Sequence, residues 1–245
     1  MKLLESRKPC PVCGGPTLTP EDDEYIRCIY CKVVRTCHHY SASLYRKEYA
    51  DTYLGYASNE TLNTPLNLLR LGLVSRWLRP HRCLLDIGCC IGEFIRFAEP
   101  YYPCMGFEPN EIAATLAKGR VHSPIVTTLG GVMLFDCITM FDVLEHIESP
   151  IENLRPLLGA SLRQDGVLII TTPNVSVVPL WEDSTLRSWK HWKPKEHLWL
   201  HTEVSLRKIA EILGLRVLYV GREESDIRPG NEDGGIITAV FRKES

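Results

Sequence analysis

The feature that most limits how this chain can fold is residues 84–94, LLDIGCCIGEF. An apolar run ends in Asp86, a loop of small residues follows, and an amphipathic segment begins at Glu93. This order predicts a buried strand, a tight turn and a helix whose N-terminal N–H groups can approach a ligand closely. Glu108 stands twenty-two residues after Asp86, at the end of a second apolar run. Nucleotide-binding βαβ units hold ribose hydroxyls with an acid placed in this way.

Strand-like and helix-like segments alternate from residue 81 to residue 245. The predicted strands cover residues 83–87, 104–107, 125–129, 137–141, 167–171, 215–220 and 236–241. The predicted helices cover residues 93–100, 110–117, 150–162 and 203–213. Alternation of this kind is typical of an α/β domain with a mostly parallel sheet covered on both faces.

The loop at residues 86–92, DIGCCIG, resembles the first motif of the class I S-adenosylmethionine (SAM)-dependent methyltransferases, acid-x-Gly-x-Gly-x-Gly. Cys90 stands where the middle glycine is usual, and its Cβ disfavours a positive φ. Residues 142–146, DVLEH, resemble the fourth motif of the same family. The resemblance covers residues 81–245 and implies a Rossmann-like, doubly wound sheet of seven strands with the last strand antiparallel.

The resemblance also implies SAM as the cofactor and assigns its contacts. Asp86 and the glycines would shape the loop at the methionine end, Glu108 would hold the ribose hydroxyls, and Phe141 would lie near the adenine or the sulfonium. The implied cofactor contacts are Asp86, Gly88, Cys89, Cys90, Gly92, Glu108, Pro109, Phe141 and Asp142. The family usually has an adenine-binding aspartate after the third strand, and residues 125–131 contain none.

Methyl transfer from a sulfonium requires an oriented acceptor and often the removal of its proton. Asp142, Glu145 and His146 have the spacing that puts side chains on one face of a helical turn. His197 precedes the last predicted helix, and both stretches should lie at the C-terminal edge of the sheet. The candidate catalytic residues are therefore Glu145, His146 and His197.

Three roles remain open for these residues. His146 or His197 could be the general base. Alternatively, Glu145, His146 and His197 could bind a second divalent ion that activates a hydroxyl. Ubiquinone-pathway O-methyltransferases and RNA 3′-terminal 2′-O-methyltransferases have a similar Glu-His pair and bind a metal near it. In the third interpretation His146 only closes the helical turn and Glu145 is solvated.

The N-terminal cysteines fall in two pairs, Cys10 with Cys13 and Cys28 with Cys31, and fourteen residues separate the pairs. Each pair can direct two thiolates at one tetrahedral ion, with a short hairpin between the pairs. The pattern resembles a zinc ribbon and predicts a structural Zn²⁺ in residues 1–37. We expect this module to depend on the metal for folding and to cap or recognise the acceptor.

Residues 38–80 are expected to form a helical connecting segment. Four tyrosines recur there at helical spacing. They are Tyr45, Tyr49, Tyr53 and Tyr56. A second helix is expected to open at Thr64 and Pro65 and to stop at Pro80.

Four of the five tryptophans fall within nineteen residues, between the fifth strand and the last helix, and basic side chains interleave with them. The tryptophans are Trp181, Trp189, Trp192 and Trp199. This composition suits a lid over the acceptor or a surface for stacked nucleic-acid bases, and it also suits simple burial.

Composition narrows the class of protein. The formal net charge is −2, which provides no general attraction to nucleic acid or an anionic membrane. No apolar run reaches the length of a membrane span and no signal-peptide core is present, so a cytoplasmic location is expected. Ten cysteines then indicate thiols and metal binding in place of disulfides.

These observations predict a SAM-dependent methyltransferase that acts on a small-molecule or saccharide-linked acceptor, with a hydroxyl as the expected target. An RNA methyltransferase that uses the ribbon and the tryptophan-rich segment is the first alternative. A non-catalytic SAM-binding or scaffold module, suggested by Cys90 and the absent adenine acid, is the second. The sequence predicts no membrane partner and no particular oligomeric state.

Overall fold

The computed structural model describes residues 3–41, 55, 60–130, 133–179, 183–231 and 233–244. The predicted tyrosine stripe at residues 45–56 lies outside the described residues, and so does Trp181. Among the described residues, no helix combines the length and the apolar character that crossing a membrane requires.

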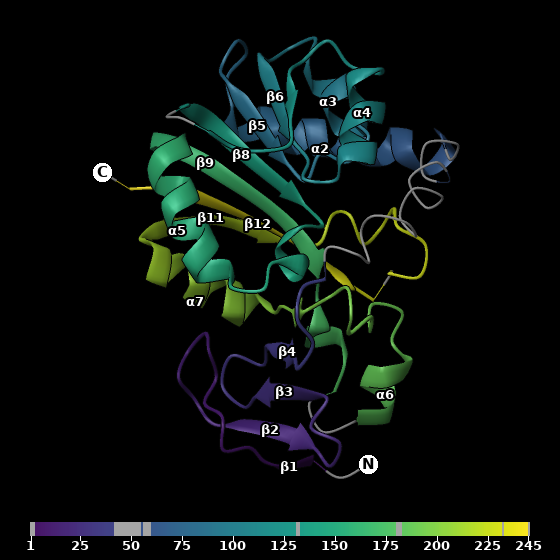
Figure 1. The fold of residues 1–245 in the computed structure, drawn as a ribbon, viewed down its shortest axis with the longest axis vertical. Helices are drawn as coiled ribbons and strands as arrows, with labels where there is room; N and C mark the ends of the chain where they lie inside the picture. The colour runs from purple at the N-terminus through teal and green to yellow at the C-terminus, as the bar shows by residue number, and fades with distance from the viewer. Residues whose placement is uncertain are drawn as a thin grey trace.

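A seven-stranded sheet forms the centre of the molecule, in the order β11-β12-β9-β8-β5-β6-β7 (Figure 1). Its strands are β5 Leu84–Ile87, β6 Cys104–Phe107, β7 Ile125–Val126, β8 Phe135–Phe141, β9 Leu162–Pro173, β11 Leu215–Gly221 and β12 Ile236–Lys243. The five strands from β7 to β9 run parallel, whereas β12 is antiparallel to both β9 and β11. The predicted Rossmann-like sheet with its antiparallel last strand is therefore confirmed.

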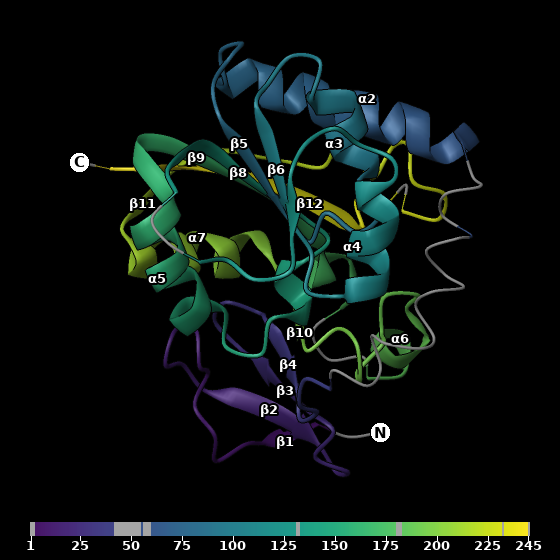
Figure 2. The ribbon, with the colours of Figure 1, turned by 45° about the horizontal axis from the view of Figure 1, so that its top comes forward.

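Helices cover both faces of this sheet (Figure 2). On one face lie α2 Glu60–Trp77, α3 Glu93–Ala98 and α4 Glu111–Lys118, and on the other lie α5 Pro150–Ser161 and α7 Glu203–Leu213. The apolar cores follow this division, because Val74 and Phe94 pack with one face of the strands while Leu154 and Leu206 pack with the other. Three short helices lie in the connections: η1 Leu144–His146, η2 Val175–Val177 and α6 Asp183–Ser188.

Helix ends follow from local sequence where capping residues are present. The Asn110 side chain accepts hydrogen bonds from two N–H groups of the first turn of α4. Thr202 and Ser205 form a capping box at the start of α7, and Gly214 ends that helix with φ 69°. Each cap contributes about 1 kcal/mol, and both helices begin where the sequence predicts.

The structure differs from the prediction in several elements. Helix α2 begins at Glu60, and Pro65 lies inside it, so the prediction that this proline opens the helix was wrong. Strand β7, at the edge of the sheet beside β6, is shorter than predicted. Strand β9 begins immediately after α5, with a register shift where Asp165 has φ 60°.

A second sheet of five strands, in the order β1-β2-β3-β4-β10, lies beside the large one (Figure 1). Its strands are β1 Leu3–Glu5, β2 Thr17–Pro20, β3 Tyr25–Cys28, β4 Val34–Thr36 and β10 Trp199–Leu200. The predicted hairpin is present as β2 and β3. Strand β10 comes from the C-terminal half of the chain and pairs antiparallel with β4. The division at residues 37 and 80 stays a prediction.

Candidate active site

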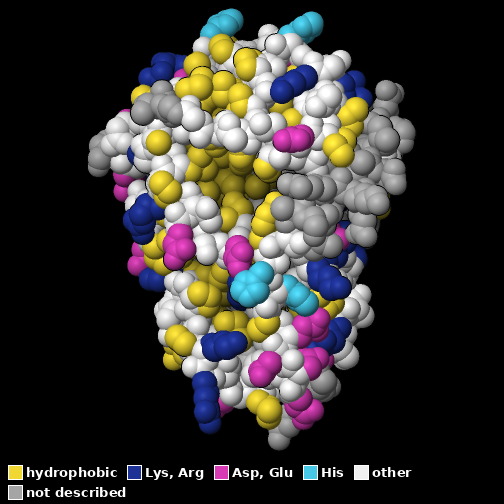
Figure 3. All heavy atoms as spheres, viewed as in Figure 1, with side chains coloured by type: hydrophobic (Ala, Val, Ile, Leu, Met, Phe, Trp, Pro, Cys, Tyr) yellow, Lys and Arg dark blue, Asp and Glu magenta, His cyan; other side chains and the backbone are white. Residues whose placement is uncertain are grey.

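A cavity of about 1510 Å³ opens at the C-terminal ends of the parallel strands. Its walls come from the loops after β5, β6, β8 and β9, from α2 and from residues 190–197. Figure 3 shows a hollow on this side of the molecule with hydrophobic side chains in its floor. Every implied cofactor contact lines the cavity except Gly92, and all three candidate catalytic residues line it as well.

The loop after β5 has the backbone conformation that its glycines require. Gly88 has φ 70°, and a Cβ there would lie 2.5 Å from Cγ2 of Val143. Gly92 has φ 79° and starts α3. Cys90 also adopts a positive φ, 52°, although its Cβ disfavours this region. Cys90 therefore adopts the backbone conformation that a glycine would have here, at a cost of about 1–2 kcal/mol. Its Cβ does not prevent the loop from forming.

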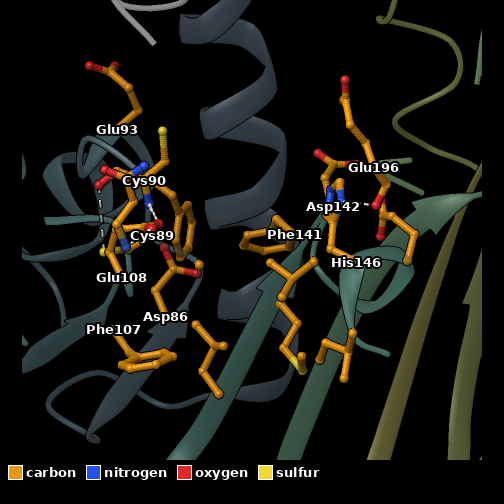
Figure 4. Close-up of a pocket in the computed structure, with 18 of the residues that line it drawn as sticks. Asp86, Cys89, Cys90, Glu93, Phe107, Glu108, Phe141, Asp142, His146 and Glu196 are labelled. Carbon is orange, nitrogen blue, oxygen red and sulfur yellow. Dashed lines mark hydrogen bonds between the residues drawn. The ribbon is translucent and has the colours of Figure 1, made fainter. Parts of the chain in front are cut away.

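Glu108 lies across the loop from Cys90 and joins the two strand–turn units. It is 5% exposed. Its Oε2 accepts a hydrogen bond from the Cys90 N–H at 3.0 Å and its Oε1 accepts one from the Asn110 N–H at 2.8 Å. Burial raises the pKa of Glu108, and these two hydrogen bonds oppose the rise. Figure 4 shows Glu108 beside Asp86 and Cys90 at one side of the cavity.

Asp86 is more deeply enclosed and accepts a hydrogen bond from Oγ1 of Thr139 at 2.7 Å. Burial raises its pKa to about 7, and the Thr139 hydrogen bond opposes the rise. Asp86 is thus partly protonated at neutral pH when the cavity holds no ligand.

Helix α2 supplies cavity residues that sequence reasoning missed. Asn67 is 3% exposed; its Nδ2 donates to the Asn63 carbonyl at 2.8 Å, and its Oδ1 has no hydrogen-bond partner among the described residues. Arg70 holds its guanidinium 4.4 Å above the Phe141 ring. Neither belongs to a motif, so only the packing of α2 over the sheet brings them to the cavity.

Asp142 lies in a network of four charged side chains. Arg70 Nη2 donates to Asp142 at 2.9 Å, and Arg228 donates to it through both Nη atoms. Both arginines also pair with Glu224, whose side chain is 2% exposed. Burial alone would raise the pKa of Asp142, but Arg228 and Arg70 hold it well below its usual range. Asp142 precedes η1 with φ 58°, and it lines the same cavity as Glu145 and His146. The common face of these three side chains stays a prediction.

The structure brings together the side chains of Glu145, His146 and His197. Their potential ligand atoms all lie within 4.8 Å of one another, and we call these residues the Glu-His-His cluster. Glu145 is 1% exposed, and its Oε2 accepts a hydrogen bond from Oγ1 of Thr172 at 3.0 Å. The other oxygen, Oε1, is buried without a hydrogen-bond partner in the part of the chain that the structure describes.

Backbone carbonyls orient both imidazoles of the cluster. His146 Nδ1 lies 2.8 Å from the Glu196 carbonyl and His197 Nδ1 lies 2.8 Å from the His191 carbonyl. A carbonyl only accepts, so each Nδ1 donates and the lone pair of each neutral ring is at Nε2. Burial lowers the pKa of His146, and burial with the nearby His146 ring lowers that of His197 to about 3. Both rings are therefore neutral at pH 7.

The described tryptophans pack and do not line the cavity. Trp192 meets Tyr25 edge to face at 5.3 Å between ring centroids, and Trp189 belongs to the same apolar cluster. Trp199 is 3% exposed and donates through Nε1 to the Glu148 carbonyl. Of the interpretations given for this segment, simple burial therefore applies to these three tryptophans. Basic side chains of the segment line the cavity instead: Lys190, His191 and Lys193.

The four N-terminal cysteines form a second cluster, outside the cavity. Sγ of Cys10 lies 3.6 Å from Sγ of Cys31, and Sγ of Cys13 lies 3.4 Å from Sγ of Cys28. A tetrahedral Zn²⁺ with bonds of about 2.3 Å separates its sulfur ligands by about 3.8 Å. The four thiols, which we call the four-cysteine cluster, therefore fit a zinc ion.

Comparison with known proteins identifies the catalytic part of the chain. A family model described as a methyltransferase domain matches residues 59–220. No curated protein matches. The plantazolicin methyltransferase BpumL in complex with S-adenosylhomocysteine (SAH) superposes with a TM-score of 0.58 and 15% identity, over 83% of this chain and 93% of that one.

Two further solved structures are similar. The magnesium protoporphyrin IX methyltransferase ChlM from Synechocystis PCC 6803, with bound SAM, has a TM-score of 0.52 and 17% identity over 74% of this chain and 79% of its own. The [4+2]-cyclase SpnF has a TM-score of 0.54 and 16% identity over 73% and 80%. At such identities these structures support the fold, and the family match supports the activity. The chain belongs to the methyltransferase-domain family and is a class I SAM-dependent methyltransferase.

Proposed function

We propose that this methyltransferase acts on a hydroxyl of a small-molecule or saccharide-linked acceptor, and that the Glu-His-His cluster activates that hydroxyl. One observation carries the proposal: the cluster lines the same cavity as the Asp86–Glu108 end, on its opposite side. Figure 4 shows the two groups facing each other across the cavity, with His146 on one side and Glu108 on the other. An acceptor between them would have its hydroxyl at the cluster and the donor methyl behind it.

At the donor end, Glu108 would accept hydrogen bonds from ribose hydroxyls, and the backbone of residues 88–92 would lie against the methionine end. Asn67 Oδ1, which lacks a partner among the described residues, can accept from the ammonium of the methionine moiety. These contacts would position the donor, and the residues that take part in the chemical step would be those of the Glu-His-His cluster on the other side of the cavity.

The cluster fits a divalent ion better than it fits a general base. Burial keeps both imidazoles neutral but makes them weak bases. The buried Oε1 of Glu145 has no hydrogen-bond partner among the described residues, and a metal would provide one. Two imidazole nitrogens and one carboxylate oxygen form a common ligand set for divalent ions. When bound, the ion would supply Lewis-acid stabilisation of the negative charge that develops on the acceptor oxygen. The Glu196 and His191 carbonyls would orient the two histidine ligands.

We also propose that the four-cysteine cluster binds Zn²⁺ in a structural role. Four sulfur ligands leave no open coordination position, and three of the four cysteines are buried.

The acceptor class can be tested with three probes: a catechol, a nucleotide-linked hexose and a short RNA. We expect SAH to form from SAM with one of the first two probes. Replacing His197 with alanine should lower turnover at least about 100-fold while SAM affinity stays within about threefold. Turnover on RNA alone, or full turnover in the His197→Ala and Glu145→Gln variants, would contradict the proposal.

The metal role needs a separate experiment. Treatment with EDTA, with the zinc content of the four-cysteine cluster counted by mass spectrometry, should abolish turnover that Mg²⁺ or Mn²⁺ then restores. Unchanged turnover at an emptied Glu-His-His cluster would assign the chemistry to the imidazoles as bases instead.

A further inference from the structure

The N-terminal module is built into the segment that carries His197. Strand β4 pairs with β10, which begins two residues after His197. The Thr36 N–H donates to the Leu198 carbonyl at 3.0 Å, so the backbone pairing continues to the residue next to His197. The five-stranded sheet thus includes the edge of the active-site segment.

Side chains strengthen this backbone connection. Thr36 is 1% exposed, and its Oγ1 lies 3.1 Å from the Pro194 carbonyl and 3.4 Å from the Leu198 carbonyl, on the two sides of His197. Further along, Oγ1 of Thr202 donates to the Cys31 carbonyl at 2.6 Å. The segment from residue 194 to residue 202 is therefore held by the N-terminal module at both ends.

The same short segment orients both imidazoles of the Glu-His-His cluster. The Glu196 carbonyl accepts from Nδ1 of His146. The His197 N–H donates to the Lys193 carbonyl at 2.7 Å, and its ring donates to the His191 carbonyl. A shift of this backbone would move His197 directly and would move His146 through the Glu196 carbonyl.

The four-cysteine cluster lies against this segment. Cys10, Cys28 and Cys31 form one apolar cluster with Leu198 and Trp199. Cys31 connects the two, because its thiol belongs to the four-cysteine cluster and its carbonyl accepts the hydrogen bond from Oγ1 of Thr202. Loss of the metal would release the loop that contacts Leu198.

The donor end of the cavity has its own supports. The hydrogen bonds of Asp86 and Glu108 go to Thr139, Cys90 and Asn110, all within the seven-stranded domain. Disturbing the N-terminal module should therefore leave SAM binding nearly unchanged while it disturbs the histidines.

We infer that the metal-loaded N-terminal module positions the active site, and that Thr36 is a positioning residue that fixes the orientation of His197 and His146. This inference rests on the proposed role of the Glu-His-His cluster. The module would then make methyl transfer depend on the metal content of a site that touches neither SAM nor the reacting atoms.

The test uses Thr36→Val, which keeps the shape of the side chain and removes its hydroxyl. Thr36→Ser, which keeps the hydroxyl, is the rescue. Thr19→Val is the matched control, because the hydrogen bonds of Thr19 Oγ1 to Asp23 and Tyr25 stay inside the module. Imidazole NMR of ¹⁵N-histidine protein reports ring orientation without any turnover, and calorimetry with SAH reports the donor site.

In Thr36→Val we expect the Nδ1–H signals of His197 and His146 to shift and to exchange with solvent at least about tenfold faster. Thr36→Ser and Thr19→Val should match the wild type, and SAH affinity should stay within about threefold in all three. If Thr36→Val does not fold, the wild-type protein is first treated with EDTA to empty the Glu-His-His cluster while zinc stays in the four-cysteine cluster. Stripping that zinc with a stronger chelator should then produce the same histidine changes at retained SAH affinity.

Unchanged histidine signals in Thr36→Val or after zinc removal would overturn the inference, and so would joint loss of histidine signals and SAH binding, which would indicate general unfolding. Failure of the proposed acceptor chemistry would appear elsewhere, as absent turnover in a wild-type protein whose histidine signals still respond to Thr36.

Discussion

The two ends of the cavity are built in different ways. At the donor end, Asp86, Gly88 and Glu108 lie on consecutive strand–turn units, and Glu108 bonds to Cys90 only eighteen positions away. At the acceptor end, the Glu196 carbonyl orients His146 from fifty positions away. Thr36 holds the His197 segment through the Pro194 carbonyl, 158 positions away. The donor end can therefore be recognised in a local motif, whereas the acceptor end exists only in the folded chain.

The largest expected effect concerns the charged network beside the acceptor end. Glu224→Ala leaves Arg70 and Arg228 with Asp142 as their shared partner, so one buried positive charge lacks compensation. We expect the free energy of unfolding to fall by about 3–5 kcal/mol, measured by urea denaturation. The control Glu203→Ala removes a partner from the exposed pair with Arg207 and should cost about 0.5 kcal/mol or less. Equal effects of the two variants would show that the network is solvent-screened.

At the donor end, Glu108→Ala should weaken SAM binding about 100-fold. The variant removes the expected contacts to the ribose hydroxyls and also the acceptor for the Cys90 N–H, each a charge-assisted hydrogen bond. Isothermal titration calorimetry measures the change, and Glu152→Ala on the exposed start of α5 is the control. An affinity for SAM equal to that of the wild type would refute the ribose role of Glu108.

The pH dependence of stability should report the burial of Asp86 at the donor end. The pKa of Asp86 is raised by burial to about 7, so the folded, ligand-free protein binds a proton that the unfolded chain releases above its ordinary value near 4. Stability should therefore fall as the pH rises from about 4 to 7, by about 1.4 kcal/mol per pH unit at most. When urea denaturation is compared at pH 5 and pH 7, Asp86→Asn should have a shallower slope than the wild type. The slope that remains would come from Glu145, whose pKa burial raises to about 8. A slope in Asp86→Asn equal to that of the wild type would assign the whole pH dependence to other groups.

The smallest effect is expected at Cys90. Replacement by glycine relieves the positive φ of 52° but adds freedom to the unfolded chain, so the two terms nearly cancel. We expect the free energy of unfolding to change by less than about 1 kcal/mol and SAM affinity by less than about threefold. A large gain in SAM affinity would show that the Cys90 side chain occupies part of the methionine site.

Much of the fold was predictable because its signals are local. Apolar runs marked the parallel strands, and Asn110, Thr202 and Gly214 marked helix ends through capping. The spacing of the two cysteine pairs predicted the four-cysteine cluster. Each of these signals depends on residues within one turn or one hairpin.

The features that could not be predicted from the sequence depend on packing between distant segments. Nothing near Asn67 or Arg70 indicates that α2 closes the cavity, and Arg228 follows no motif that marks it as a partner of Asp142. Asp142 precedes η1 with φ 58°, and the helical spacing of residues 142–146 does not indicate its ion pairs with Arg70 and Arg228. The pairing of β10 with β4 had no signal at all in the tryptophan-rich segment.

The most direct test of the account is a crystal structure of the protein with SAH bound. We predict that Glu108 contacts both ribose hydroxyls and that the SAH sulfur faces the Glu-His-His cluster across the cavity. A bound SAH whose sulfur faces away from Glu145, His146 and His197, or whose ribose lies away from Glu108, would contradict the assignment of the two ends.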